Sequence, residues 1–235
     1  MERNEIIRAL VEIRDREFLF ARQYLADAGI DLVNAPQEAK SYLETKANAG
    51  FPEAQLALSK LLLTPLIGPR DRAKAFAWCN SSAEAGYVPA LVLLSAFYTQ
   101  GWCVQRDDIR AISLLAQAAE EGYAHAAALL ATAFSGGIRV PIDREKGQKF
   151  LVQAAEGGDA NSQFMLGLEL LKSTDEEERK AGPRWLLLAA DQDLVSAHQE
   201  LAHLYREGDA GLPLDDAKSR FHQQRADELQ YGAQG

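Results

Sequence analysis

The segment HQELAH, residues 198–203, is the stretch of this chain that most resembles a metal-binding motif. Zinc proteases place two histidines four residues apart, so that both imidazoles lie on one face of a helix. His198 and His203 are five residues apart, which on a helix turns one away from the other by about 140°. The spacing therefore predicts no zinc site.

Other residue types that could do chemistry lack the neighbours that they would need. The sequence contains no phosphate loop, dinucleotide-binding glycine pattern, nucleophile elbow or metal knuckle. Ser135 stands beside two glycines in FSGGIRV, without a histidine and acid attached, which indicates a loop serine. His125 and His222 are expected to be isolated surface histidines. We predict no catalytic residue, no metal and no cofactor, and hence a protein that is not an enzyme.

The net charge and the lengths of the apolar runs exclude some classes of partner. The 235 residues carry a formal net charge of −9, with 47% hydrophobic and 25% charged residues. Because nucleic-acid binding needs basic surfaces, we expect no nucleic-acid partner. The longest apolar runs are far below the ~20 residues that span a bilayer, so we expect no membrane insertion.

The amino-terminal residues carry scattered charges instead of the apolar core of a signal peptide. A cytoplasmic protein is therefore expected, and a periplasmic one only if a leader was removed. Cys79 and Cys103 are expected to be free thiols, with a disulfide as the alternative.

A regular repeat runs through most of the chain. Four glycines are each 36 residues apart: Gly50, Gly86, Gly122 and Gly158. Asp193 takes the next turn position, one residue early. An alanine stands three residues before each turn, and a small residue four residues after it: Ala54, Ala90, Ala126, Ser162 and Ala197. A second series of acidic residues has the same period: Asp71, Asp107, Asp143 and Asp215. This spacing predicts repeated structural units.

Each repeated residue has a physical reason. A glycine just past a helix adopts the left-handed conformation without a Cβ clash, and an aspartate before a helix accepts hydrogen bonds from its free N–H groups. The helix after each turn carries a leucine at one position: Leu58, Leu94, Leu130, Leu166 and Leu201. Large residues recur in the helix before the turn: Tyr42, Trp78, Leu114, Phe150 and Trp185. Two helices per unit are expected to bury these residues by stacking on neighbouring units.

This pattern resembles the Sel-1-like repeat, a relative of the tetratricopeptide repeat. The segments 101–122, 137–158 and 208–218 carry its loop and capped helix, with Cys103 where glycine is usual. The resemblance implies an all-α fold, a right-handed α-α superhelix or solenoid of about five helix-turn-helix repeats. We expect three parts: a capping helix or degenerate first repeat over 1–37, repeats over 38–215, and a capping helix and tail over 216–235.

Two regions depart from the repeat. The segment 173–180 lacks the loop glycine and contains an acidic run, so a longer or shifted helix is expected there. At the amino terminus, an amphipathic helix is expected over residues 3–28. A loop over 29–39 then carries Asn34 and Pro36 as helix-start signals.

The resemblance also implies a concave groove that is lined by the first helix of each repeat. With tetratricopeptide geometry, positions two, six and nine after the small residue face this groove. In the carboxyl-terminal half, the predicted partner-binding residues are Thr132, Ser135, Phe164, Leu168, Leu171, Gln199, His203 and Arg206. Apolar anchors beside cationic side chains suit a peptide or a helix of a partner. The alternative for Phe164 and Leu168 is packing between repeats.

Members of this family act mostly as adaptors and scaffolds, and some bacterial members are immunity proteins that neutralise a secreted toxin. The resemblance therefore implies a protein-binding adaptor, scaffold or regulator. An immunity protein and a sensor of a small ligand are the alternatives.

Overall fold

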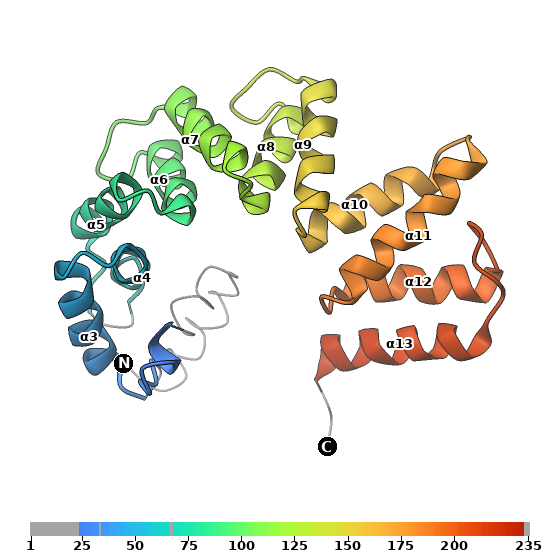
Figure 1. Ribbon diagram of the computed structural model, residues 1–235, viewed down its shortest axis with the longest axis horizontal. Coiled ribbons are helices and arrows are strands. Elements are labelled where there is room, and N and C mark those ends of the chain that lie inside the picture. The colour runs from blue at the N-terminus through green and yellow to red at the C-terminus, as the bar shows by residue number, and fades with distance from the viewer. Residues whose placement is uncertain (1–23, 33, 66–67, 233–235) are drawn as a thin grey trace. The chain divides into compact units, whose positions relative to one another are not determined.

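The computed structural model describes residues 24–32, 34–65 and 68–232, and every regular element in these ranges is a helix (Figure 1). The helices are α3 (Pro36–Asn48), α4 (Pro52–Leu62), α5 (Arg72–Glu84), α6 (Val88–Gln100), α7 (Asp108–Glu120), α8 (Ala124–Gly136), α9 (Arg144–Glu156), α10 (Ala160–Leu171), α11 (Glu176–Ala190), α12 (Val195–Glu207) and α13 (Asp216–Tyr231). The all-α repeat fold is thereby confirmed. The chain divides into two compact units, Met1–Ala118 and Ala119–Gly235.

The predicted turn positions all adopt the left-handed backbone. Gly50, Gly86, Gly122 and Gly158 have φ angles between 82° and 90°, and Asp193 has φ 59°. Aspartate is among the few residues with a side chain that tolerate this region. The fifth turn is therefore built like the others, although it lacks glycine.

The acidic residues of the second series begin helices, as their spacing predicts. Asp71, Asp107, Asp143 and Asp215 each accept a backbone N–H from the residue three positions later, at 2.9–3.0 Å. In Asp71 and Asp143 this hydrogen bond is the main reason why the carboxyl pKa lies below its ordinary value. The caps therefore fix where the second helix of each repeat starts.

The leucine and small-residue positions form the core. Every leucine of the repeated series is buried, and so is every small residue four positions after a turn. In the amino-terminal unit, Leu25 and Leu32 join the cluster that α3, α4, α5 and α6 form. In the carboxyl-terminal unit, α11 and α12 form a cluster around Leu186 and Leu201.

Helix α11 is the expected departure from the repeat. It has 15 residues and begins at Glu176, because Asp175 accepts the backbone N–H groups of Glu177 and Glu178. The acidic run is thus the first turn of a helix, where negative charge suits the helix dipole.

The amino-terminal expectations are met in part. Of the helix expected over 3–28, residues 3–23 lie outside the described residues. Pro36 begins α3 as predicted, but Ala35 is its N-cap and provides no side-chain hydrogen bond. The side chain of Asn34 donates to Asp31 instead, so the prediction of Asn34 as a helix-start signal was wrong.

The loops between the helices of a repeat contain a second left-handed position, two residues after the glycine that ends the first helix. Cys103, Arg139 and Ala210 occupy it with φ angles of 52°, 67° and 51°. A side chain is disfavoured in this conformation, which explains why the repeat family usually has glycine there. Cys103 and Cys79 are free thiols, as predicted.

Candidate functional site

Three first helices of the carboxyl-terminal unit, α8, α10 and α12, carry the predicted partner-binding residues. Thr132 on α8 and Gln199, His203 and Arg206 on α12 are exposed. The hydroxyl of Thr132 donates to the Ala128 carbonyl at 3.0 Å, which leaves its methyl group available to solvent or a partner. These four side chains are accessible to a binding partner.

Ser135 is exposed, yet it lies beside the second helix of its repeat. Gly147 on α9 approaches the backbone and side chain of Ser135 so closely that a Cβ at residue 147 would collide with them. Ser135 therefore lies at a contact between α8 and α9 and is placed at the edge of any face that α8 presents.

The three apolar residues predicted on α10 are half-buried. Phe164 and Leu171 both pack against the α11–α12 cluster, and Leu171 also lies against Gly182. Much of their apolar surface is thus used to hold repeats together. Leu168 is also half-buried and lies one turn after Phe164 on the same helix.

Two exposed apolar residues on these helices were missed by the sequence analysis. Leu129 on α8 and Met165 on α10 are 36% and 55% exposed. Both occupy the third position after the small residue of their repeat and are 36 residues apart. We define the first-helix face as seven residues of α8, α10 and α12, all of them exposed except the half-buried Leu168: Leu129, Thr132, Met165, Leu168, Gln199, His203 and Arg206.

The helix period explains the miss. Around a helix, position three lies about 60° from position six, whereas position two lies about 40° from position six on its other side, so the predicted positions two, six and nine leave position three out. Position two is filled by Leu56, Val92 and Phe164, of which the first two are buried. Leu129 and Met165 each directly precede a core leucine and lie about 100° from it around the helix, so their exposure depends on which segments pack beside them.

Charges of both signs border the first-helix face. On α12, His203 and Arg206 lie one turn apart, and the amide of Gln199 donates to Gln230 of α13 at 3.4 Å. Elsewhere in this unit, Arg179 is paired with Asp209 at 2.9 Å. Among the residues that define the face, Arg206 is the permanent cation, so the cationic side of the face is at its α12 end.

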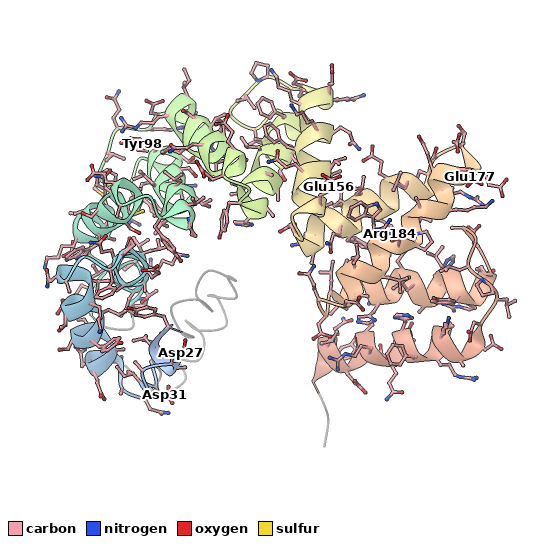
Figure 2. All side chains as sticks on the ribbon, viewed as in Figure 1. Asp27, Asp31, Tyr98, Glu156, Glu177 and Arg184 are labelled. Carbon is pink, nitrogen blue, oxygen red and sulfur yellow. The ribbon has the colours of Figure 1, made fainter. Side chains whose placement is uncertain are left out.

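The described residues contain no candidate metal site, and the two depressions in their surface are open. No group of three or more histidine, cysteine, aspartate or glutamate side chains in ranges 24–32, 34–65 and 68–232 could hold a metal ion. Two depressions of about 660 and 640 Å³ lie open to solvent, one beside Tyr98 and one along α9 as far as Glu156, both labelled in Figure 2. Neither contains a predicted partner-binding residue. Among the described helices, none is both long and apolar enough to cross a membrane.

The expectation for His222 was wrong. Its side chain is buried rather than on the surface, and its Nδ1 atom lies 2.9 Å from Nδ1 of His198. The two residues are 24 positions apart and meet because α13 packs beside α12 (Figure 1). His125 is half-buried, with its ring edge against Tyr123.

Comparison with known proteins agrees with this architecture. The family model described as Sel1 repeat matches residues 52–87, 88–123, 124–159, 160–194 and 195–226. Sel1 repeat proteins generally mediate protein–protein interactions, and the family is typically a non-catalytic helical scaffold. No curated protein matches the chain.

Three solved structures of bacterial proteins are similar to this chain. A Sel1 repeat protein from Oxalobacter formigenes is 26% identical, with a TM-score of 0.73 over 82% of this chain and 56% of that chain. A protective antigen of uropathogenic Escherichia coli with an SLR fold is 23% identical, with a TM-score of 0.69 over 88% of this chain and 45% of that chain. A protein described as Pseudomonas aeruginosa 5086 is 16% identical, with a TM-score of 0.61 over 92% of this chain and 83% of that chain. The chain spans about half the length of the first two.

Proposed function

This chain belongs to the Sel1 repeat family, and on that premise we propose that it is a non-enzymatic adaptor that binds a segment of another protein on the first-helix face. The bound segment is a peptide or a helix with an apolar side chain that covers Met165 and Leu129. An acidic or polar group next to that side chain lies against His203 and Arg206.

The exposure of Met165 is the observation that carries this proposal. Most apolar residues at repeat positions of α10 are buried or half-buried, whereas Met165 is 55% exposed. Methionine side chains are flexible and polarizable, and they are frequent on surfaces that bind proteins. Leu129 repeats the exposure on α8, so two successive repeats of the carboxyl-terminal unit present an apolar side chain at the same position.

The charges around these side chains favour a partner with an apolar anchor and a neighbouring carboxylate. Burying an apolar side chain supplies most of the affinity at such a site, and charges at its rim direct the orientation. Arg206 provides a permanent cation at the α12 end of the face. Nucleic acid fits poorly, because the chain as a whole carries a net charge of −9.

The proposal is tested by affinity purification from the native host with variants of the full chain as bait. Met165→Glu places a charge within the proposed contact, and Ile109→Glu is the matched control on α7, where Ile109 is 85% exposed. We expect one protein to co-purify with the wild type and with Ile109→Glu and to be at least about tenfold depleted with Met165→Glu, the equivalent of about 1.4 kcal/mol. Equal recovery with all three baits would contradict the assignment of the face.

The same purification separates the adaptor from its alternatives. An immunity protein would form a tight complex with one toxin, and the complex would be sensitive to Met165→Glu only if the toxin uses this face. A ligand sensor would yield no protein partner and would instead be stabilised against thermal unfolding by a small molecule.

A further inference from the structure

The last repeat has a histidine where two other repeats have glutamine. His198 directly follows the small residue of α12, the position of Gln55 in α4 and of Gln163 in α10. Each glutamine donates its side-chain N–H to the backbone carbonyl eight residues earlier. Gln55 donates to Ala47 at 3.2 Å, and Gln163 donates to Ala155 at 3.1 Å. In these two repeats the position therefore ties the first helix to the end of the preceding helix.

The helix that packs on α12 has a second unusual histidine. His222 lies seven residues after the N-cap Asp215 of α13, as Phe150 lies seven residues after the N-cap of α9. Phe150 stacks on Phe134 with ring centroids 5.9 Å apart and planes 10° apart. His222 stacks in the same way on Tyr205, with ring centroids 5.7 Å apart and planes 7° apart. An ionisable ring thus replaces a purely apolar one in an otherwise repeated contact.

The two histidines share one hydrogen bond inside the α12–α13 contact. The Nδ1 atoms are 2.9 Å apart, and the residues are 5% and 7% exposed. A bond between two imidazole nitrogens needs one N–H and one lone pair, which two neutral rings provide. When both rings are protonated, two N–H groups and two positive charges face each other, and the bond is lost.

Charges around His198 come from α13 and from the turn that follows α11. Burial is the main reason why the His198 pKa lies below its ordinary value, and Arg225 of α13 acts in the same direction. Asp193 and Asp191, which follow α11, oppose this shift, as does the backbone of Ala190. Asp193 is bonded to Arg225 at 2.8 Å, which keeps the two opposing charges close together.

The pKa of His222 is also below its ordinary value. Burial is again the main cause, followed by the neighbouring His198; Lys218 of α13 acts in the same direction and Asp191 opposes it. The remaining ring neighbours are Tyr205 and Phe221, which supply no countercharge. The pair is therefore held in a site that disfavours the protonated forms.

We infer that His198 and His222 form a proton-sensitive latch, which holds α13 on α12 while both rings are neutral and weakens as the pair takes up protons. Two other contacts also hold α13: the hydroxyl of Ser219 donates to the Ala202 carbonyl of α12 at 2.7 Å, and Arg225 is paired with Asp193 in the turn before α12. Neither of these contacts contains a histidine. The latch thus adds a pH-dependent contribution to an interface that is otherwise independent of pH in the range where histidine titrates.

The sign of the effect follows from proton linkage. Because both pKa values are lowered in the docked state, the detached state binds more protons. The contribution of the pair is complete above the ordinary histidine pKa of about 6.5 and is progressively lost as the pH falls below that value. Carboxylates with ordinary pKa values near 4 remain mostly ionised at about pH 5, so this range isolates the histidines.

The latch is tested by hydrogen exchange of the full chain at about pH 7.5 and about pH 5, with rates corrected for the intrinsic pH dependence of exchange. We expect the protection of the α13 amides to fall several-fold more than that of the α9 amides, because the detached state of α13 takes up protons that the docked pair disfavours. The α8–α9 contact, with Phe134 and Phe150, is the internal control because it has the same ring stack without histidine.

The double variant His198→Gln/His222→Phe installs the residues that other repeats carry at these two positions. It should keep α13 protected at both pH values and lose the extra pH dependence. The same loss of α13 protection in the variant and the wild type would overturn the inference. If the double variant does not fold, the titration of the wild-type imidazoles by NMR decides: ordinary pKa values for both rings would overturn it equally.

Discussion

In the amino-terminal unit, the small residue of α4 is Ala54. The second residue after it, Leu56, is 1% exposed, and the third, Ala57, is fully buried. In the carboxyl-terminal unit, the third positions of α8 and α10 are Leu129 and Met165, both exposed. The repeat pattern is the same in both units. Leu56 and Ala57 belong to a cluster that Leu25 and Leu32, from the segment before α3, also join. The difference shows that one repeat position serves as core in one unit and as surface in the other, according to what packs on it.

The largest expected effect comes from a pair of alanine substitutions that compares the two units. Leu56→Ala should lower the free energy of unfolding by about 2–5 kcal/mol, because it leaves a cavity in a closely packed cluster. Met165→Ala should change it by no more than about 0.5 kcal/mol, since the side chain is largely in solvent. Urea denaturation of both variants measures the difference. Equal losses of stability would show that Met165 belongs to the core and would remove the basis for the first-helix face.

A smaller effect is expected at the start of α10. Asp159 is buried and accepts the backbone N–H of Ser162 at 2.8 Å, whereas the N-caps of α4 and α6, Phe51 and Tyr87, provide no side-chain hydrogen bond. Asp159→Ala should cost about 1 kcal/mol of unfolding free energy, the usual loss of an N-cap. Tyr87→Ala serves as a comparison for packing without a cap. If thermal and urea unfolding of Asp159→Ala match the wild type, the side-chain cap does not set the position of α10.

The smallest effect concerns the left-handed loop position. Cys103→Gly should raise the free energy of unfolding by up to about 1 kcal/mol, because glycine adopts φ 52° without steric cost. The gain is limited because the Cys103 thiol donates to the Arg72 carbonyl at 3.2 Å and this contact is lost. Cys103→Ala is the control, since it removes the thiol and keeps the strain. A lower stability of Cys103→Gly than of Cys103→Ala would contradict the strain argument.

Much of the fold followed from residues with strict local requirements. The turn glycines, the capping aspartates and the core leucines recur every 36 residues, and each has the role that its chemistry requires. Even Asp193 could be assigned to the fifth turn from its register alone. The longer helix α11 was also predictable, because its acidic run is a good first turn.

The candidate site was less predictable, because exposure depends on contacts between segments that are distant in sequence. Phe164 and Leu171 occupy positions expected to face a groove, but they pack on α11 and α12. His222 lies on a helix rich in polar residues and was expected at the surface. Counting seven residues from Asp215 would have placed it at the large-residue position of the repeat, yet its contact with His198 arises only when α13 packs on α12.

Site-specific photo-crosslinking in the native host tests the role of the first-helix face most directly. A photoreactive amino acid is placed in turn at positions 129, 165, 93 and 109, where 93 is the α6 counterpart of 165 and 109 lies on α7. We predict crosslinks to one and the same protein from positions 129 and 165, and none from positions 93 and 109. Crosslinks from 93 or 109 without any from 165 would contradict the assignment of partner binding to this face.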